Sequence, residues 1–71
     1  MAKQAFVISF YAKGERRPSD CYGDFVATRS EAHDAGREYL HMARQDRIEG
    51  GPLAWIHRYT VRRVMLPEAG R

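Results

Sequence analysis

Hydrophobic positions along this chain first follow the pattern of β-strands. Residues 5–11, AFVISFY, form a nearly continuous apolar run rich in β-branched and aromatic side chains, which is typical of a strand at the centre of a sheet. We therefore expect a first strand over residues 3–13. The segment 14–20, GERRPSD, is charged and holds Gly and Pro, which indicates a turn. Residues 21–28 then predict a second, less apolar strand that forms a hairpin with the first.

A helical period follows the hairpin. Apolar residues recur at spacings of three and four, and so fall on one face of a helix: they are Ala32, Ala35, Gly36, Tyr39, Leu40 and Ala43. Thr28 followed by Glu31 fits a capping box, with Ser30 as a competing cap. The sequence GGP at 50–52 ends the helix, so we expect a helix over 29–49. Because most of the stripe is Ala or Gly, the helix can approach a sheet closely.

The last apolar segment, residues 53–66, reads LAWIHRYTVRRVML and contains three arginines and no acidic residue. Its β-branched and aromatic content predicts a third strand. Side chains alternate across a strand, so this strand should have one cationic face and one aromatic face that seeks the core. His57 falls on the aromatic side, where we expect a partly buried strand histidine.

The order strand, strand, helix, strand leaves few topologies. If the hairpin is antiparallel and the helix crosses over in the right-handed sense, the third strand runs parallel to the second and pairs beside the first. We therefore predict a single small α+β domain over residues 1–71, with a three-stranded antiparallel or mixed sheet in the order 2-1-3 and one helix packed on one face. Residues 67–71 are expected to form a short flexible tail.

The sheet face away from the helix should be open to solvent. The side chains expected to face the helix are Phe6, Ile8, Phe10, Phe25, Ala27, Trp55, Tyr59 and Val61. Those expected on the open face are Val7, Ser9, Tyr11, Asp24, Val26, Ile56, Arg58, Thr60 and Arg62. A register slip of one residue in any strand would exchange its two faces.

Composition and charge narrow the class of protein. Seventy-one residues with a hydrophobic fraction of 44% suit one small globular core. The net charge of +3 is unevenly spread: residues 30–50 hold three arginines against five acidic residues, whereas residues 51–71 hold four arginines against one glutamate. The predicted helix is therefore acidic, and the predicted third strand is basic.

The single cysteine, Cys21, excludes an internal disulfide and suits a reducing cytosol. We expect it to be a small apolar residue near the start of a strand. The beginning of the chain reads as a strand rather than a signal peptide, and no segment approaches the roughly 18 to 20 apolar residues of a membrane span. These features predict a soluble, cytoplasmic protein without membrane association.

No motif for catalysis or metal binding is present. The carboxylates are not paired by spacing to serve as an acid and a base, and the glycines do not form a phosphate-binding loop. His33 and His41 lie eight residues apart, about 12 Å along a helix, which is too far to share one ion. We expect a protein that is not an enzyme and that uses no cofactor or metal.

Function then rests on a surface. Arg58 and Arg62 are expected beside Tyr11 on the open face, and Arg16 and Arg17 in the hairpin loop would extend this basic area. Guanidinium groups pair with carboxylate and phosphate oxygens in a planar geometry. We predict docking on an acidic protein or nucleoprotein surface, with these five residues as contacts.

Three alternatives stay open. The first is sequence-independent nucleic-acid binding, in which Tyr11 stacks on an unpaired base. The second is a structural homodimer that pairs through the open face or the edge of the second strand. The third is an ordinary solvated face whose arginines protect strand edges from aggregation.

The chain's size and strand-strand-helix-strand order resemble many small proteins encoded by phages and mobile elements, including some anti-CRISPR inhibitors that bind a host nucleoprotein complex. The resemblance is one of architecture. It implies action by occluding a surface, without chemistry of its own. The net charge of +3 departs from the acidic nucleic-acid mimics among such inhibitors, so mimicry of DNA is not the expected mechanism.

Overall fold

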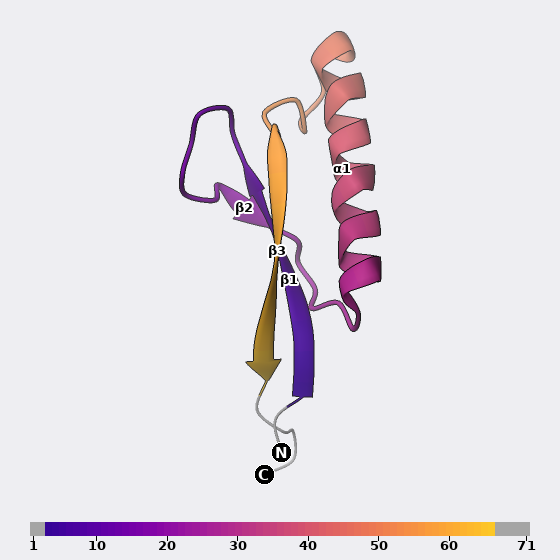
Figure 1. The fold of residues 1–71 in the computed structure, drawn as a ribbon. Helices are drawn as coiled ribbons and strands as arrows, with labels where there is room; N and C mark the ends of the chain where they lie inside the picture. Colours follow the sequence, from indigo (N-terminus) through magenta and orange to yellow (C-terminus); the bar gives the residue numbers. More distant parts are fainter. Residues whose placement is uncertain (1–2, 67–71) are drawn as a thin grey trace.

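The computed structural model describes residues 3–66, which form a three-stranded antiparallel sheet with one helix against one face (Figure 1). The elements are β1 (Lys3–Tyr11), β2 (Asp20–Cys21), α1 (Arg29–Glu49) and β3 (Arg58–Leu66). Strand β1 is central, in the order β2-β1-β3. The predicted α+β class and strand order are confirmed. The tail predicted at 67–71 lies outside the described residues.

The long ladder between β1 and β3 sets the two faces of the sheet. It runs without interruption from Lys3↔Leu66 to Tyr11↔Arg58. Because directly opposed residues share a face, Arg62 lies beside Val7 on the side away from α1. Tyr59 and Val61 are partly buried and pack with the core on the α1 side. The alternation predicted for β1, and for β3 from Arg58 onward, is confirmed.

Strand β2 differs from the prediction, because it contains only Asp20–Cys21 instead of residues 21–28. Farther along, the chain returns to β1 through one isolated bridge, Phe6↔Val26, with N···O distances of 2.8 and 3.0 Å. Val26 therefore shares the α1 side with Phe6, and its neighbours Phe25 and Ala27 point to the other side. The predicted faces of these three residues were wrong. Hydrogen bonding to β1 sets the register of this segment, and the hydrophobicity of Phe25 does not turn it toward the core.

The segment before β3 also differs from the prediction. Residues 52–55 form turns, and the strand begins at Arg58 instead of residue 53. Two side chains at the end of α1 hold the turns: Asp46 Oδ2 accepts from the Leu53 amide at 2.7 Å, and Arg47 Nη1 donates to the Ile56 carbonyl at 2.8 Å. Ile56 is consequently 1% exposed in the core, which overturns its predicted place on the open face.

Three smaller predictions also need correction. His57 is exposed rather than partly buried, because it lies between the turns and β3. Cys21, predicted as a small apolar residue near the start of a strand, lies in β2 and is exposed. The first strand ends at Tyr11 instead of Lys13.

Helix α1 has the predicted bounds. Thr28 is its N-cap, and the Thr28 hydroxyl accepts from the Glu31 amide at 3.1 Å, which satisfies a free donor at the helix start. Gly50 ends the helix in the left-handed conformation at φ 81°, where glycine carries no steric penalty. Gly36 faces Tyr59 so closely that a Cβ there would overlap the ring. This glycine lets the ring lie against the helix backbone.

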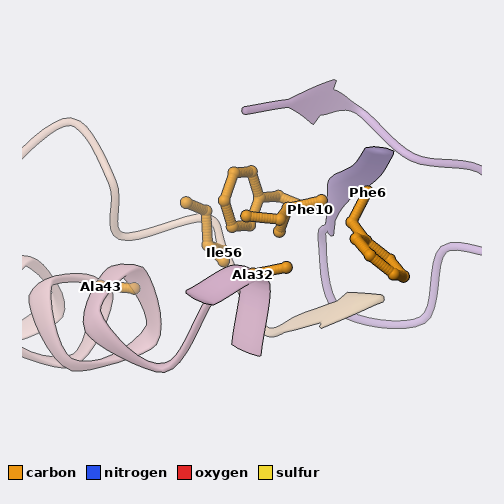
Figure 2. Close-up of a cluster of buried hydrophobic side chains, with 6 residues drawn as sticks. Phe6, Phe10, Ala32, Ala43 and Ile56 are labelled. Atoms are coloured by element: carbon orange, nitrogen blue, oxygen red, sulfur yellow. The ribbon is translucent and has the colours of Figure 1, made fainter. Parts of the chain in front are cut away.

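The core lies between α1 and the sheet. Figure 2 shows Phe10 of β1 close to Ile56, from the segment before β3, and to Ala32 of α1, with Phe6 of the same buried cluster farther to one side. The Phe10 ring stacks on Tyr39 of α1 with centroids 4.9 Å apart. The small helix residues bring α1 close, and the aromatic residues of β1 fill the remaining volume. Helix α1 thereby covers one face of the sheet, and the opposite face is not covered by it.

Candidate functional site

We use the name open face for the sheet surface directed away from α1. The registers place on it Lys3, Ala5, Val7, Ser9, Tyr11, Cys21, Phe25, Ala27, Arg58, Thr60, Arg62, Val64 and Leu66. In Figure 1 the loop between β1 and β2 projects from the side of the sheet opposite to α1. The open face and this loop therefore form one accessible side of the molecule.

The end of the open face near this loop is basic and aromatic. Tyr11 and Arg58 are direct cross-strand partners, and the guanidinium carbon of Arg58 lies 3.7 Å from the Tyr11 ring centroid. This is a cation–π contact. The Tyr11 hydroxyl lies 3.2 Å from Thr60 Oγ1. Two predicted site residues, Tyr11 and Arg58, are thus brought into direct contact by the β1–β3 register.

This packing changes what Tyr11 can do. One face of its ring is covered by Arg58, and its hydroxyl is hydrogen-bonded to Thr60. A base platform needs a free aromatic face beside a path for the phosphate backbone. Tyr11 fits better as an anchor that holds the Arg58 guanidinium in place.

The hairpin loop is tied to the same end of the face. Arg58 Nη2 donates to the Glu15 carbonyl at 3.1 Å, which holds the loop beside the start of β3. Arg16 and Arg17 follow Glu15 directly and are exposed. Within residues 3–66, no hydrogen bond or ion pair joins Arg16 or Arg17 to the sheet. The loop therefore adds two free cationic side chains near Arg58.

The middle of the open face is hollowed. One shallow hollow of about 280 Å³ is lined by Val7, Cys21 and Arg62 together with Ser9 and residues 18–20. Its neighbour of about 270 Å³ shares Val7 and Cys21 and is walled by residues 22–25. Arg62 therefore lines a hollow of mixed polarity that adjoins the more apolar hollow walled by residues 22–25.

Phe25 makes the far end of the open face apolar. Its side chain is 59% exposed, and it lines both the hollow beside Val7 and a smaller one of about 150 Å³ that includes Ala5 and Leu66. Sequence reasoning missed Phe25 and Cys21 as residues of this surface. The sequence carries no signal for them, because their direction depends on the bridge to Phe6 and on the pairing of Cys21 with Ser9.

The charge of Arg62 is not neutralised within the described part of the chain. Asp20 lines the same hollow, but its Oδ1 accepts from the Cys21 amide at 2.8 Å. The carboxylate–arginine pair found among residues 3–66 joins Asp34 and Arg37 on the exposed side of α1. Arg62 thus keeps its donors available for a partner.

No family model, curated protein or solved structure matches this chain. Among the described residues, no group of three or more His, Cys, Asp or Glu side chains could hold a metal ion. The single described helix is not long and apolar enough to span a membrane.

Proposed function

We propose that this chain is a non-catalytic binding module that docks its open face and hairpin loop on an acidic protein or nucleoprotein surface. The observation that carries the proposal is that Arg58 and Arg62 share one side of the sheet with an apolar hollow, which adjoins the hollow that Arg62 lines. Protein interfaces combine an apolar centre with aromatic and arginine side chains around it. The open face has this composition.

Charge supports an acidic partner. The described acidic residues concentrate on α1, on the other side of the sheet, whereas β3 holds Arg58, Arg62 and Arg63 without an acidic residue. Arginine binds carboxylates through two parallel hydrogen bonds. Electrostatic complementarity would orient the partner and accelerate the encounter.

Two features favour a protein surface over bare nucleic acid. The Tyr11 ring is partly covered by Arg58, so stacking on a base is impaired. The exposed Phe25 extends the apolar area, which a partner's apolar side chain can cover.

The proposed action is occlusion of the partner's surface. Arg58, Arg62, Arg16 and Arg17 supply the electrostatic contacts, and Tyr11 holds Arg58 in position. In a chain encoded by a phage or mobile element, such docking would inhibit a host defence complex, as the architectural resemblance implies. A chain that acts by occlusion needs no reactive group.

The proposal is tested by selecting ligands from a displayed random peptide library on the wild-type protein. We expect the selected peptides to be rich in Asp and Glu with at least one apolar residue. The variant Arg58→Glu with Arg62→Glu should bind them at least about tenfold more weakly, equivalent to about 1.4 kcal/mol. The matched control, Arg37→Glu with Arg44→Glu, carries the same charge change on exposed positions of α1 and should bind as the wild type does.

Two outcomes would overturn the proposal. One is the selection of peptides without acidic enrichment. The other is equal binding of the peptides by the wild type and by the folded variant Arg58→Glu with Arg62→Glu. Either would show that the open face does not bind an acidic surface. Fluorescence anisotropy with labelled single-stranded and duplex DNA, at about 50 and 200 mM salt, tests the alternative. Tight binding that falls steeply with salt and is lost in the sheet variant would replace protein docking with nucleic-acid binding.

A further inference from the structure

The outer edge of β3, which is the edge that does not pair with β1, is a second exposed feature of the sheet. Within residues 3–66, strand β3 pairs with β1 alone, over nine residues. It contains no proline, and its ladder has no bulge. An unpaired edge strand of this length presents a row of backbone donors and acceptors to any extended chain that can lie beside it.

The hydrogen bonds that β1 makes on its β2 side show which backbone groups of β3 point to the outer edge. On β1, the backbone groups of Phe6, Ile8 and Phe10 bond toward the β2 side. The β1 residues between them must direct their backbone groups to β3, because the direction of the N–H and C=O groups alternates along a strand. The β3 residues that these groups face are Arg58, Thr60, Arg62 and Val64. The backbone groups of Tyr59, Val61, Arg63 and Met65 consequently point to the outer edge.

Charge distinguishes between two possible occupants of this edge, which are a second copy of the chain and an acidic strand of another protein. The charged side chains of β3 are all arginines: Arg58 and Arg62 on the open face and Arg63 on the α1 side. If a second copy paired antiparallel about Arg62 or Arg63, identical arginines would face each other, and pairing about Val61 would place the two Arg62 side chains diagonally. Like charges in such positions destabilise a strand pair. Carboxylates at alternate positions of an added strand would meet the arginines favourably.

We propose that β3 binds an extended acidic segment of the partner protein as a fourth strand, with its acidic side chains at alternate positions. This inference rests on the proposed function and specifies the part of the partner that the module recognises. Main-chain hydrogen bonds to Tyr59, Val61, Arg63 and Met65 supply the affinity. Arg58 and Arg62 supply the selection for acidic side chains on the open face.

The test uses the whole chain and two synthetic peptides of the length of β3, nine residues. The probe alternates glutamate and valine, and the control has the same charge with proline at each valine. We expect only the probe to bind. Backbone amide exchange measured by NMR should slow by about tenfold or more at Tyr59, Val61, Arg63 and Met65 when the probe saturates the protein.

A pair of variants checks the same edge. Arg63→Pro removes one outward N–H at an edge position, where proline is tolerated, and Arg63→Gln makes the same charge change but keeps that N–H. The proline variant should lose most of the probe affinity, while the glutamine variant retains more of it. If the proline variant does not fold, the comparison of the two peptides on the wild type still decides the question.

The outcomes separate this inference from the proposed function. Equal binding of probe and control, or binding that leaves the four edge amides unprotected, would overturn strand addition. Failure of the probe to bind, while library-selected acidic peptides bind and depend on Arg58 and Arg62, would also overturn strand addition and leave the proposed function intact. Concentration-dependent protection of the four amides without any peptide would show a second copy at the edge and overturn the inference.

Discussion

Ile56 and Ile48 are the same side chain in opposite surroundings. Ile56 is 1% exposed between the sheet and α1, whereas Ile48 is 82% exposed near the end of the helix. The difference arises because Arg47 and Asp46 hold the turns before β3 and direct Ile56 inward. At the residue scale, the burial of Ile56 therefore depends on two polar side chains rather than on strand alternation.

Replacement of each isoleucine by alanine tests this reading. Ile56→Ala should lower the free energy of unfolding by about 2 to 5 kcal/mol, because it removes buried methyl groups and leaves a cavity. Ile48→Ala should change it by no more than about 0.5 kcal/mol. Urea denaturation followed by circular dichroism measures both. Equal effects of the two substitutions would contradict the burial of Ile56.

At the element scale, α1 is the part of the structure whose limits are set locally. Thr28 caps its start and Gly50 closes its end. Ser30, the competing cap, lies within the helix. The contacts that define these limits join residues close in sequence, which is why the predicted bounds 29–49 are confirmed.

Removing the Thr28 hydroxyl and, separately, the Ser30 hydroxyl tests which of the two residues caps the helix. Thr28→Ala should cost about 1 kcal/mol of stability, since the Glu31 amide loses its acceptor. Ser30→Ala should lie within about 0.5 kcal/mol of the wild type. Thermal or urea unfolding gives the comparison. A larger loss at Ser30 than at Thr28 would mean that the helix begins later than the structure shows.

At the scale of the whole molecule, charge is divided between the two sides of the sheet. The side formed by α1 carries most of the acidic residues, and the open face with its loop carries arginines. Two copies that met through their open faces, or through the β3 edges, would bring like charges together. This arrangement favours a heterologous acidic partner over self-association.

We therefore predict a monomer. Sedimentation velocity at about tens of micromolar protein, in low and in moderate salt, should give a single species with the mass of one chain. Repulsion between exposed charges weakens as salt rises, so the measurement at moderate salt is the stricter one. A stable dimer at both salt concentrations would favour the homodimer alternative.

The sequence by itself determined the order of elements, the central place of the most apolar strand, the helix limits and the alternation of β3 from Arg58 onward. These depend on local periodicity, capping and turn residues, which act over a few positions. It also predicted that Tyr11, Arg58 and Arg62 would share a face.

Only the tertiary structure decided the rest. Three features depend on residues distant in sequence: the short β2, the outward direction of Phe25 and the contact of Arg58 with Tyr11. The burial of Ile56 depends on side chains at the end of α1 that hold the turns before β3. Side-chain direction in a strand reverses with a shift of one residue, so a single long-range bridge such as Phe6↔Val26 outweighs local hydrophobicity. The hollow beside Arg62 exists for the same reason, because it forms where β1, β2 and β3 lie side by side.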